Sequence, residues 1–175
     1  MSIIKEEIIK LLNDQLNKEH YSANLYFNMA GWCDKQGLKG CSKFLYTHAS
    51  EEQTHLDKFR DFINKVGGQP IITDMKAPKY EFKDVKELFE EIVKHEQFIT
   101  LCINDLVGKS MDNKDYITLK FLDYFLEEQL EEEELFNDIL DKIKILDDLK
   151  DGRNLYTFDK AIGNLDTQKH NTINL

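Results

Sequence analysis

Proline and glycine are scarce in this chain, which has two prolines and eight glycines among its 175 residues. Both residues interrupt helices, so their scarcity, together with long runs rich in Leu, Ile, Glu, Lys and Phe, indicates an all-α protein. A chain of this length can bury one substantial core and is short for two. We therefore expect one helical domain over residues 1–165, followed by a polar C-terminal tail over residues 166–175.

Long apolar runs and an excess of basic residues are also missing. No run reaches the roughly 18 apolar residues of a membrane span, and charges interrupt the N-terminal MSIIKEEIIK too often for a signal peptide. The formal net charge of -10 disfavours nucleic acid and anionic membranes as partners and favours cations. Cys33, Cys41 and Cys102 form no CxxC motif and are typical of reduced thiols, which predicts a cytoplasmic protein.

Helical periodicity fills most of the chain. The sequence predicts long helices over residues 3–31, 38–66, 84–110 and 114–145, and a shorter fifth helix near 153–162. Ser2 is the expected N-cap of the first helix, and Asp84 with Glu87 has the spacing of a capping box before the third.

The connections between these helices predict the topology. Residues 32–37 and 111–113 are short connections, which make antiparallel neighbours. Residues 67–83 reach about 56 Å when extended, enough to run the length of a helix of about 40 Å. The second and third helices are therefore expected to be parallel. The predicted fold is a four-helix bundle of two antiparallel hairpins joined by a long crossover, plus the short fifth helix.

Each of the four long helices carries an acidic residue on its apolar stripe. These residues are Glu19, Glu52, Glu96 and Glu132, and all lie near the middle of their helix, so the bundle brings them to one height. His55 follows Glu52 by three residues and projects from the same face. Carboxylates crowded in a core repel one another unless a cation offsets their charge, so the pattern predicts a metal centre. Glu52 is expected to bridge two ions, since it lies between Glu19 and His55 on one side and Glu96 on the other.

The types of ligand narrow the choice of metal. Several carboxylates with one imidazole suit iron or manganese, whereas structural zinc sites use more Cys or His. Many di-iron bundles carry two Glu-x-x-His motifs, but here the fourth helix offers Gln129 and Glu132 instead of a second motif. One metal position therefore has few nitrogen ligands, and we expect it to bind iron more weakly and to let it pass.

The chain resembles the bacterial non-haem ferritins over about residues 5–167. The resemblance rests on the segments NKEHYSANLY, HASEEQTH, KHEQFIT, LEEQLEEEELF and DLKDGRNLYTFDK. It implies a ferroxidase that oxidises Fe(II) with dioxygen or hydrogen peroxide and stores the product as a ferric oxyhydroxide mineral. It also implies a homo-oligomeric hollow shell of 24 subunits, with the fifth helix near a four-fold axis.

The resemblance also implies a set of site residues. Glu19, Glu52 and His55 match the first iron site; Glu52, Glu96 and Gln129, with Glu132 close by, match the second; and Glu51, Glu128, Glu131 and Glu132 match a third, more exposed site. Tyr26 matches the tyrosine beside the di-iron centre and is expected to supply an electron during oxygen reduction. Gln53 occupies the place of the haem-ligating Met of bacterioferritins, so no haem is expected.

Two other functions stay open on the sequence alone. One is a di-iron peroxidase or oxidase of the rubrerythrin-like type that acts without mineral storage, which requires a pocket beside the metals. The other is a non-catalytic helical assembly protein whose buried acids pair with Lys, although few Lys fall on the inward positions. His20, His48 and His95 show no spacing that demands a ligand role, and His95 is expected at the surface or at an interface.

Overall fold

The structure is a computed structural model that describes residues 2–146 and 149–169, with side chains described as far as residue 165. The helices within these residues are α1 (Glu6–Lys35), α2 (Lys39–Lys65), α3 (Val85–Asp112), α4 (Tyr116–Leu146) and α5 (Gly152–Lys169), and no strand occurs among them. The predicted all-α class and helix order are confirmed. The fifth helix is longer than expected, and the part of the predicted tail beyond residue 169 lies outside the described residues.

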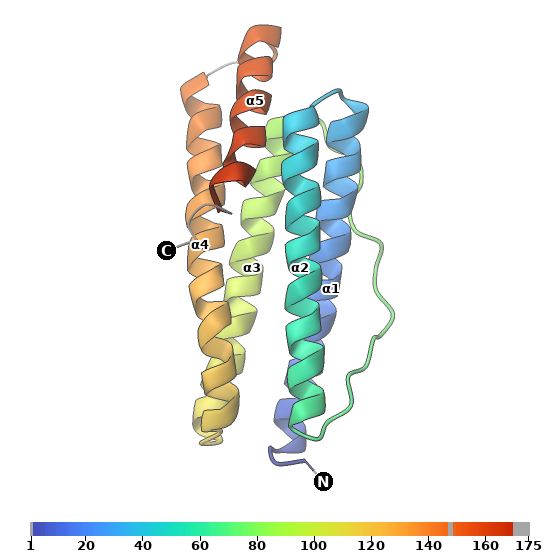
Figure 1. The fold of residues 1–175 in the computed structure, drawn as a ribbon, viewed down its shortest axis with the longest axis vertical. Helices are drawn as coiled ribbons and strands as arrows, with labels where there is room; N and C mark the ends of the chain where they lie inside the picture. Colours follow the sequence, from blue (N-terminus) through green and yellow to red (C-terminus); the bar gives the residue numbers. More distant parts are fainter. Residues whose placement is uncertain (1, 147–148, 170–175) are drawn as a thin grey trace.

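The four long helices form a bundle of two antiparallel hairpins, α1 with α2 and α3 with α4 (Figure 1). The crossover between α2 and α3 runs the length of the bundle beside α1, so α2 and α3 are parallel as predicted. Within the described residues, no helix is both long and apolar enough to cross a membrane.

Two asparagine side chains on α1 hold the crossover in its extended path. Asn13 Oδ1 accepts a hydrogen bond from Ile71 N at 2.7 Å, and Asn17 Oδ1 accepts one from Thr73 N at 2.9 Å. The Asn17 amide also donates to Ile71 O at 2.8 Å. The backbone of this segment thus finds hydrogen-bond partners without forming helix or strand.

The N-cap predictions are only partly right. Ser2 does not cap α1, which begins at Glu6 after Lys5 with no side-chain cap; Ser2 Oγ instead donates to Val66 O at 3.1 Å, at the end of α2. Asp84 does cap α3 by accepting from Glu87 N at 2.9 Å. In a full capping box the Glu87 carboxylate would accept a hydrogen bond from Asp84 N. It accepts one from Lys83 N instead, so this second half of the capping box does not form.

A buried polar layer divides the apolar core into two clusters. One cluster contains Tyr26, Phe44 and Phe136 among others, and the second contains Phe59 and Phe125 among others. The four acidic residues predicted on the inward faces, Glu19, Glu52, Glu96 and Glu132, are all buried. The layer between the clusters is where the acidic residues of the four stripes meet.

Candidate metal centre

The polar layer collects side chains from all four long helices. Its members are Glu19 on α1, Glu52 and His55 on α2, Glu96 on α3, and Gln129 and Glu132 on α4, and each is at most 6% exposed. The structure thus brings together the carboxylates and the imidazole that the sequence placed at one height. In the described part of the chain, no Lys or Arg side chain is buried, so neither of these residue types neutralises the layer.

The first cluster in the layer contains Glu19, Glu52 and His55. His55 Nδ1 lies 3.4 Å from Glu52 Oε2 and 3.9 Å from Glu19 Oε2. Each residue offers one ligand atom, and the three atoms lie within 4.8 Å of one another. Gln15 Nε2 donates to Glu19 Oε1 at 2.6 Å and holds that carboxylate in place. Two carboxylates and an imidazole at these separations can share one divalent ion.

The second part of the layer is built on Glu96. Tyr26 donates its hydroxyl hydrogen to Glu96 Oε1 at 2.5 Å, and Gln129 Nε2 lies 3.2 Å from Glu96 Oε2. Glu52 and Glu132 are close enough for their charges to act on one another and on Glu96. Among the described residues, the hydrogen-bond donors to the Glu96 carboxylate are Tyr26 and Gln129 rather than a histidine, in agreement with the missing second Glu-x-x-His motif.

Burial and mutual repulsion shift the titration of these groups. Burial, and then the charge of Glu52, raises the pKa of Glu19 to about 8. Burial, and then the charge of Glu132, raises the pKa of Glu96 to about 7, and burial likewise raises the pKa of Glu52. Burial lowers the pKa of His55, but hydrogen bonds to Glu128 and Glu52 outweigh it and raise this pKa to about 11. A multivalent cation would reverse the repulsion, as expected for a metal centre.

The four glutamates assigned to a third site do not all meet. Glu51 and Glu132 lie together, but Glu128 Oε2 is 3.7 Å from His55 Nε2 and Glu131 is exposed on α4. The residue that completes the Glu51–Glu132 group is His48, to which the sequence analysis gave no ligand role. The spacing of three residues between His48 and Glu51 on one helix was the signal that could have found it.

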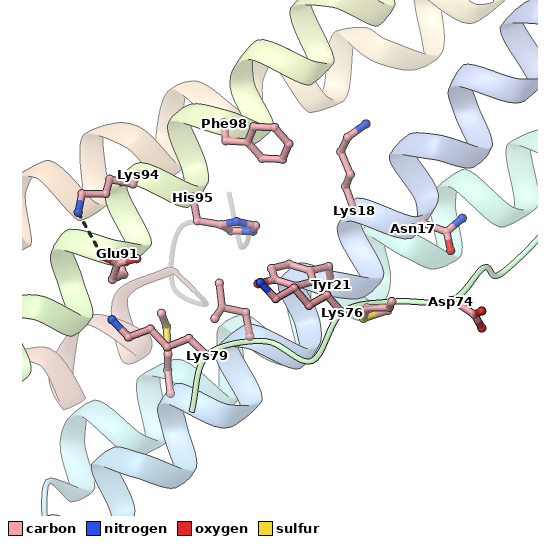
Figure 2. A pocket seen from close by; sticks show the side chains of 13 residues that line it. Asn17, Lys18, Tyr21, Asp74, Lys76, Lys79, Glu91, Lys94, His95 and Phe98 are labelled. Carbon is pink, nitrogen blue, oxygen red and sulfur yellow. Dashed lines mark hydrogen bonds and ion pairs between the residues drawn. The ribbon is translucent and has the colours of Figure 1, made fainter. Parts of the chain in front are cut away.

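A separate surface pocket of about 620 Å³ lies between α1, α3 and the crossover (Figure 2). His95 and Tyr21 line it, with ring centroids 5.7 Å apart, and Ser22 Oγ lies 2.7 Å from His95 Nε2. His95 therefore faces away from the neighbouring Glu96 and is half-buried in the wall of this surface pocket. None of the candidate iron ligands lines this pocket, so it does not supply the substrate pocket that a rubrerythrin-like enzyme requires.

A bundle of four long helices with inward carboxylates and a Glu-x-x-His motif is typical of metal-binding carboxylate bundle proteins. The comparisons with known proteins specify the family within this class. A family model for the ferritin-like domain matches residues 9–146, and the chain belongs to that family.

The curated relatives and solved structures agree with this assignment. A probable bacterial non-heme ferritin-like protein of Haemophilus influenzae is 46% identical over 166 residues, which cover 95% of this chain and 99% of that protein. A bacterial non-heme ferritin of Campylobacter jejuni is 42% identical over 163 residues, which cover 93% of this chain and 96% of that protein. The solved structure of an open pore ferritin from Archaeoglobus fulgidus superposes with a TM-score of 0.89 at 36% sequence identity. The match covers 93% of this chain and 98% of that one. The resemblance to non-haem ferritins is confirmed.

Proposed function

We propose that the protein is an iron-storage ferroxidase. The observation that carries the proposal is the buried Glu19–Glu52–His55 cluster beside Glu96, in a bundle of the ferritin-like domain family. Carboxylates bind both oxidation states of iron, and an anionic layer favours Fe(III) over Fe(II). Iron is here the substrate and the stored product.

The proposed reaction uses two Fe(II) ions side by side. Glu19, Glu52 and His55 hold one ion, Glu52, Glu96 and Gln129 hold the second, and Glu52 bridges them. Each Fe(II) gives up one electron, and dioxygen takes both electrons with two protons to leave as hydrogen peroxide; hydrogen peroxide can in turn serve as the oxidant. The protein supplies the position of the ions and the charge around them, whereas the electrons come from the metal.

The second position is expected to hold iron loosely. Gln129 is neutral, and its amide nitrogen points at Glu96. Binding through the amide oxygen therefore requires the group to turn and gives up its hydrogen bonds to Glu96 and Thr100. This cost, with the absence of a second imidazole, favours release of Fe(III) towards the mineral and frees the position for the next Fe(II).

Tyr26 is proposed to donate an electron to the reacting centre. Its ring is fully buried, and its hydroxyl bonds to Glu96, so the electron and the hydroxyl proton have a direct route into the layer. Freeze-quenched samples mixed with Fe(II) and dioxygen should show a tyrosyl radical by electron paramagnetic resonance. Its presence at equal intensity in Tyr26→Phe would exclude Tyr26 as the donor.

The proposed assembly is a hollow homo-oligomer of 24 chains in the cytoplasm. The solved ferritins that this chain matches support a multimeric assembly, and the three free thiols favour a reducing compartment. We expect no haem, nucleic acid or membrane partner.

The test is aerobic addition of Fe(II) to metal-free protein, followed by ferric absorbance. Fast oxidation that saturates near about two Fe(II) per chain, followed by slower loading far beyond that number, supports storage. Oxidation that stops after the first phase favours a rubrerythrin-like peroxidase or oxidase. Absence of any oxidation favours a non-catalytic assembly protein.

A further inference from the structure

We propose that the surface pocket between α1, α3 and the crossover binds a small organic anion with a planar aromatic body, such as an aromatic carboxylate, sulfonate or phosphate ester. The pocket has a volume of about 620 Å³, within the range of roughly 300–1,000 Å³ that is usual for sites of small organic ligands. None of the proposed iron ligands lines it, so the inference goes beyond the proposed function and does not depend on it.

Basic residues prevail around the pocket although the chain as a whole is acidic. Two of the lining residues are acidic and four are lysines, namely Lys18, Lys76, Lys79 and Lys94. In the whole chain, by contrast, 33 acidic residues outnumber 23 basic ones. The charge around the pocket is thus opposite in sign to that of the molecule, which favours an anion there over a cation.

Two of the four lysines are not neutralised by a carboxylate of the chain. Lys79 and Lys94 each donate to a glutamate, at 2.8 Å and 3.1 Å. Lys18 and Lys76 form no ion pair with any residue in the part of the chain that the structure describes. Their ammonium groups, one from α1 and one from the crossover, are therefore available for the charge of a ligand (Figure 2).

The interior of the pocket is apolar and aromatic. The lining residues Leu25 and Met29 are 6% and 0% exposed. Figure 2 shows the rings of His95 and Phe98 projecting from α3 towards α1, which carries Tyr21. Phe98 is 50% exposed, so its ring offers apolar surface that a ligand can cover. An inorganic anion cannot use these walls, whereas an aromatic anion uses both the rings and the lysines.

A hydrogen bond fixes the ring of His95 in the wall. Ser22, which is 1% exposed, has its Oγ 2.7 Å from His95 Nε2 and 3.1 Å from Lys18 O. Because the hydroxyl gives its single hydrogen to that carbonyl oxygen, His95 Nε2 donates the hydrogen of the other bond. The imidazole is therefore held in one orientation, and a ligand that packs against it does not have to order it.

The crossover side of the pocket is also held in place. Asn17 Oδ1 accepts a hydrogen bond from Thr73 N at 2.9 Å, and Asn28 Nδ2 donates one to Pro78 O at 3.3 Å. Lys76 lies between these two anchor points. A wall that is fixed to α1 on both sides of its free lysine loses little conformational entropy when a ligand binds.

The first test is isothermal titration calorimetry of naphthalene-2-sulfonate, a planar aromatic anion, into the assembled, metal-free protein. We expect saturable binding of about one molecule per chain, and affinity for the uncharged 2-naphthalenemethanol at least about tenfold lower, because it lacks the charge. Inorganic sulfate at the same concentration should not compete, because it lacks the aromatic body. Equal affinity for the charged and uncharged compounds, or no saturable binding, would overturn the proposal.

The second test changes the charge of the wall. Lys76→Glu reverses an exposed charge and should weaken binding of the sulfonate at least about tenfold, while the affinity for 2-naphthalenemethanol stays within about twofold. Lys10→Glu is the matched control: it makes the same change at an exposed position of α1 that does not line this pocket, and it should keep the wild-type affinity. Light scattering checks that both variants assemble. Equal affinity for the sulfonate in wild type and Lys76→Glu would contradict the inference.

The third test needs no variant. Crystals of wild type soaked in 6-bromonaphthalene-2-sulfonate and measured at the bromine absorption edge should show an anomalous peak beside Tyr21, His95 and Phe98. A peak elsewhere, or a pocket covered by a neighbouring subunit, would refute the assignment. Tighter binding of an acidic peptide with one Trp would assign the pocket to a protein partner instead. All three tests use metal-free protein, so failure of Fe(II) oxidation would reject the ferroxidase function and leave these results standing.

Discussion

At the residue scale, Glu52 and His55 are the pair on which the proposed chemistry depends, because Glu52 belongs to both proposed iron positions and His55 is the imidazole proposed for the first. We predict that Glu52→Ala combined with His55→Ala abolishes the fast phase of Fe(II) oxidation while the helical assembly persists. The double change removes the Glu52 carboxylate and the His55 imidazole together, so neither is left buried without its partner, and this limits the loss of stability. Stopped-flow absorbance measures the rate, and light scattering measures the assembly.

The control for this variant is Glu127→Ala, which removes an exposed carboxylate from α4 outside the layer. Its oxidation rate should match that of wild type. Wild-type rates in the double variant would remove Glu52 and His55 from the mechanism.

The titration of the layer gives a second prediction at this scale. In the folded chain the pKa of Glu19 is raised to about 8, that of Glu96 to about 7 and that of His55 to about 11. At a pH between the unfolded-state and folded-state pKa of such a group, the folded chain therefore binds more protons than the unfolded chain. The stability they contribute is fully present below the unfolded pKa and is lost as pH rises through the folded pKa. The melting temperature of metal-free protein should therefore fall between pH 6 and pH 8.5.

Zn(II) should reverse this trend. Because the ion must displace protons from the carboxylates, it binds more tightly at higher pH and should raise the melting temperature more at pH 8 than at pH 6. Differential scanning fluorimetry with and without Zn(II) measures both effects. A melting temperature of the metal-free protein that rises over this range would contradict the assignment of these shifts to the layer.

At the scale of elements, the contact between α2 and α5 depends on the absence of side chains at Gly40 and Gly163. A Cβ at Gly40 would lie 1.9 Å from Asp159 O, and one at Gly163 would lie 2.8 Å from Gly40 Cα. The same close approach lets the Asp159 carboxylate accept from Gly40 N at 3.0 Å and from Cys41 N at 2.8 Å, at the first turn of α2.

We predict that Gly40→Ala displaces α5 and lowers the free energy of unfolding by about 1–3 kcal/mol, because the backbones must separate. The fast phase of Fe(II) oxidation should stay near that of wild type, since the proposed iron ligands lie on α1 to α4. Gly108→Ala is the matched control: a Cβ there meets nothing within 4 Å, and the change should stabilise the helix by up to about 1 kcal/mol. Urea unfolding separates the two outcomes, and equal effects of both changes would contradict the packing argument.

At the scale of the whole molecule, the isolated chain exposes large apolar side chains that an assembly would cover. Tyr116, Leu130 and Ile145 are 71%, 72% and 82% exposed. We predict that light scattering coupled to size exclusion gives a mass about 24 times the 20.6 kDa of the chain. Elution as a monomer or dimer would count against a storage shell.

The bundle and its central layer could be predicted because both follow from periodicity and length. Spacings of three and four placed Glu19, Glu52, Glu96 and Glu132 on inward faces, and a residue near the middle of a helix keeps its height whichever way the helix runs. The length of the crossover, compared with the length of a helix, predicted that α2 and α3 are parallel. The sequence by itself therefore determined the fold class, the topology and the buried carboxylates.

Only the tertiary structure decided which side chains face one another across helices. His48 is one turn from Glu51 in the chain, but its approach to Glu132 depends on how α2 and α4 are rotated and packed. Packing likewise decides that Glu128 lies beside His55 and that Ser2 bonds to the end of α2. It also decides that Asn13 and Asn17 form hydrogen bonds with the crossover. Periodicity gives the face of a residue on its own helix, whereas partners on other helices are chosen by packing of the whole core.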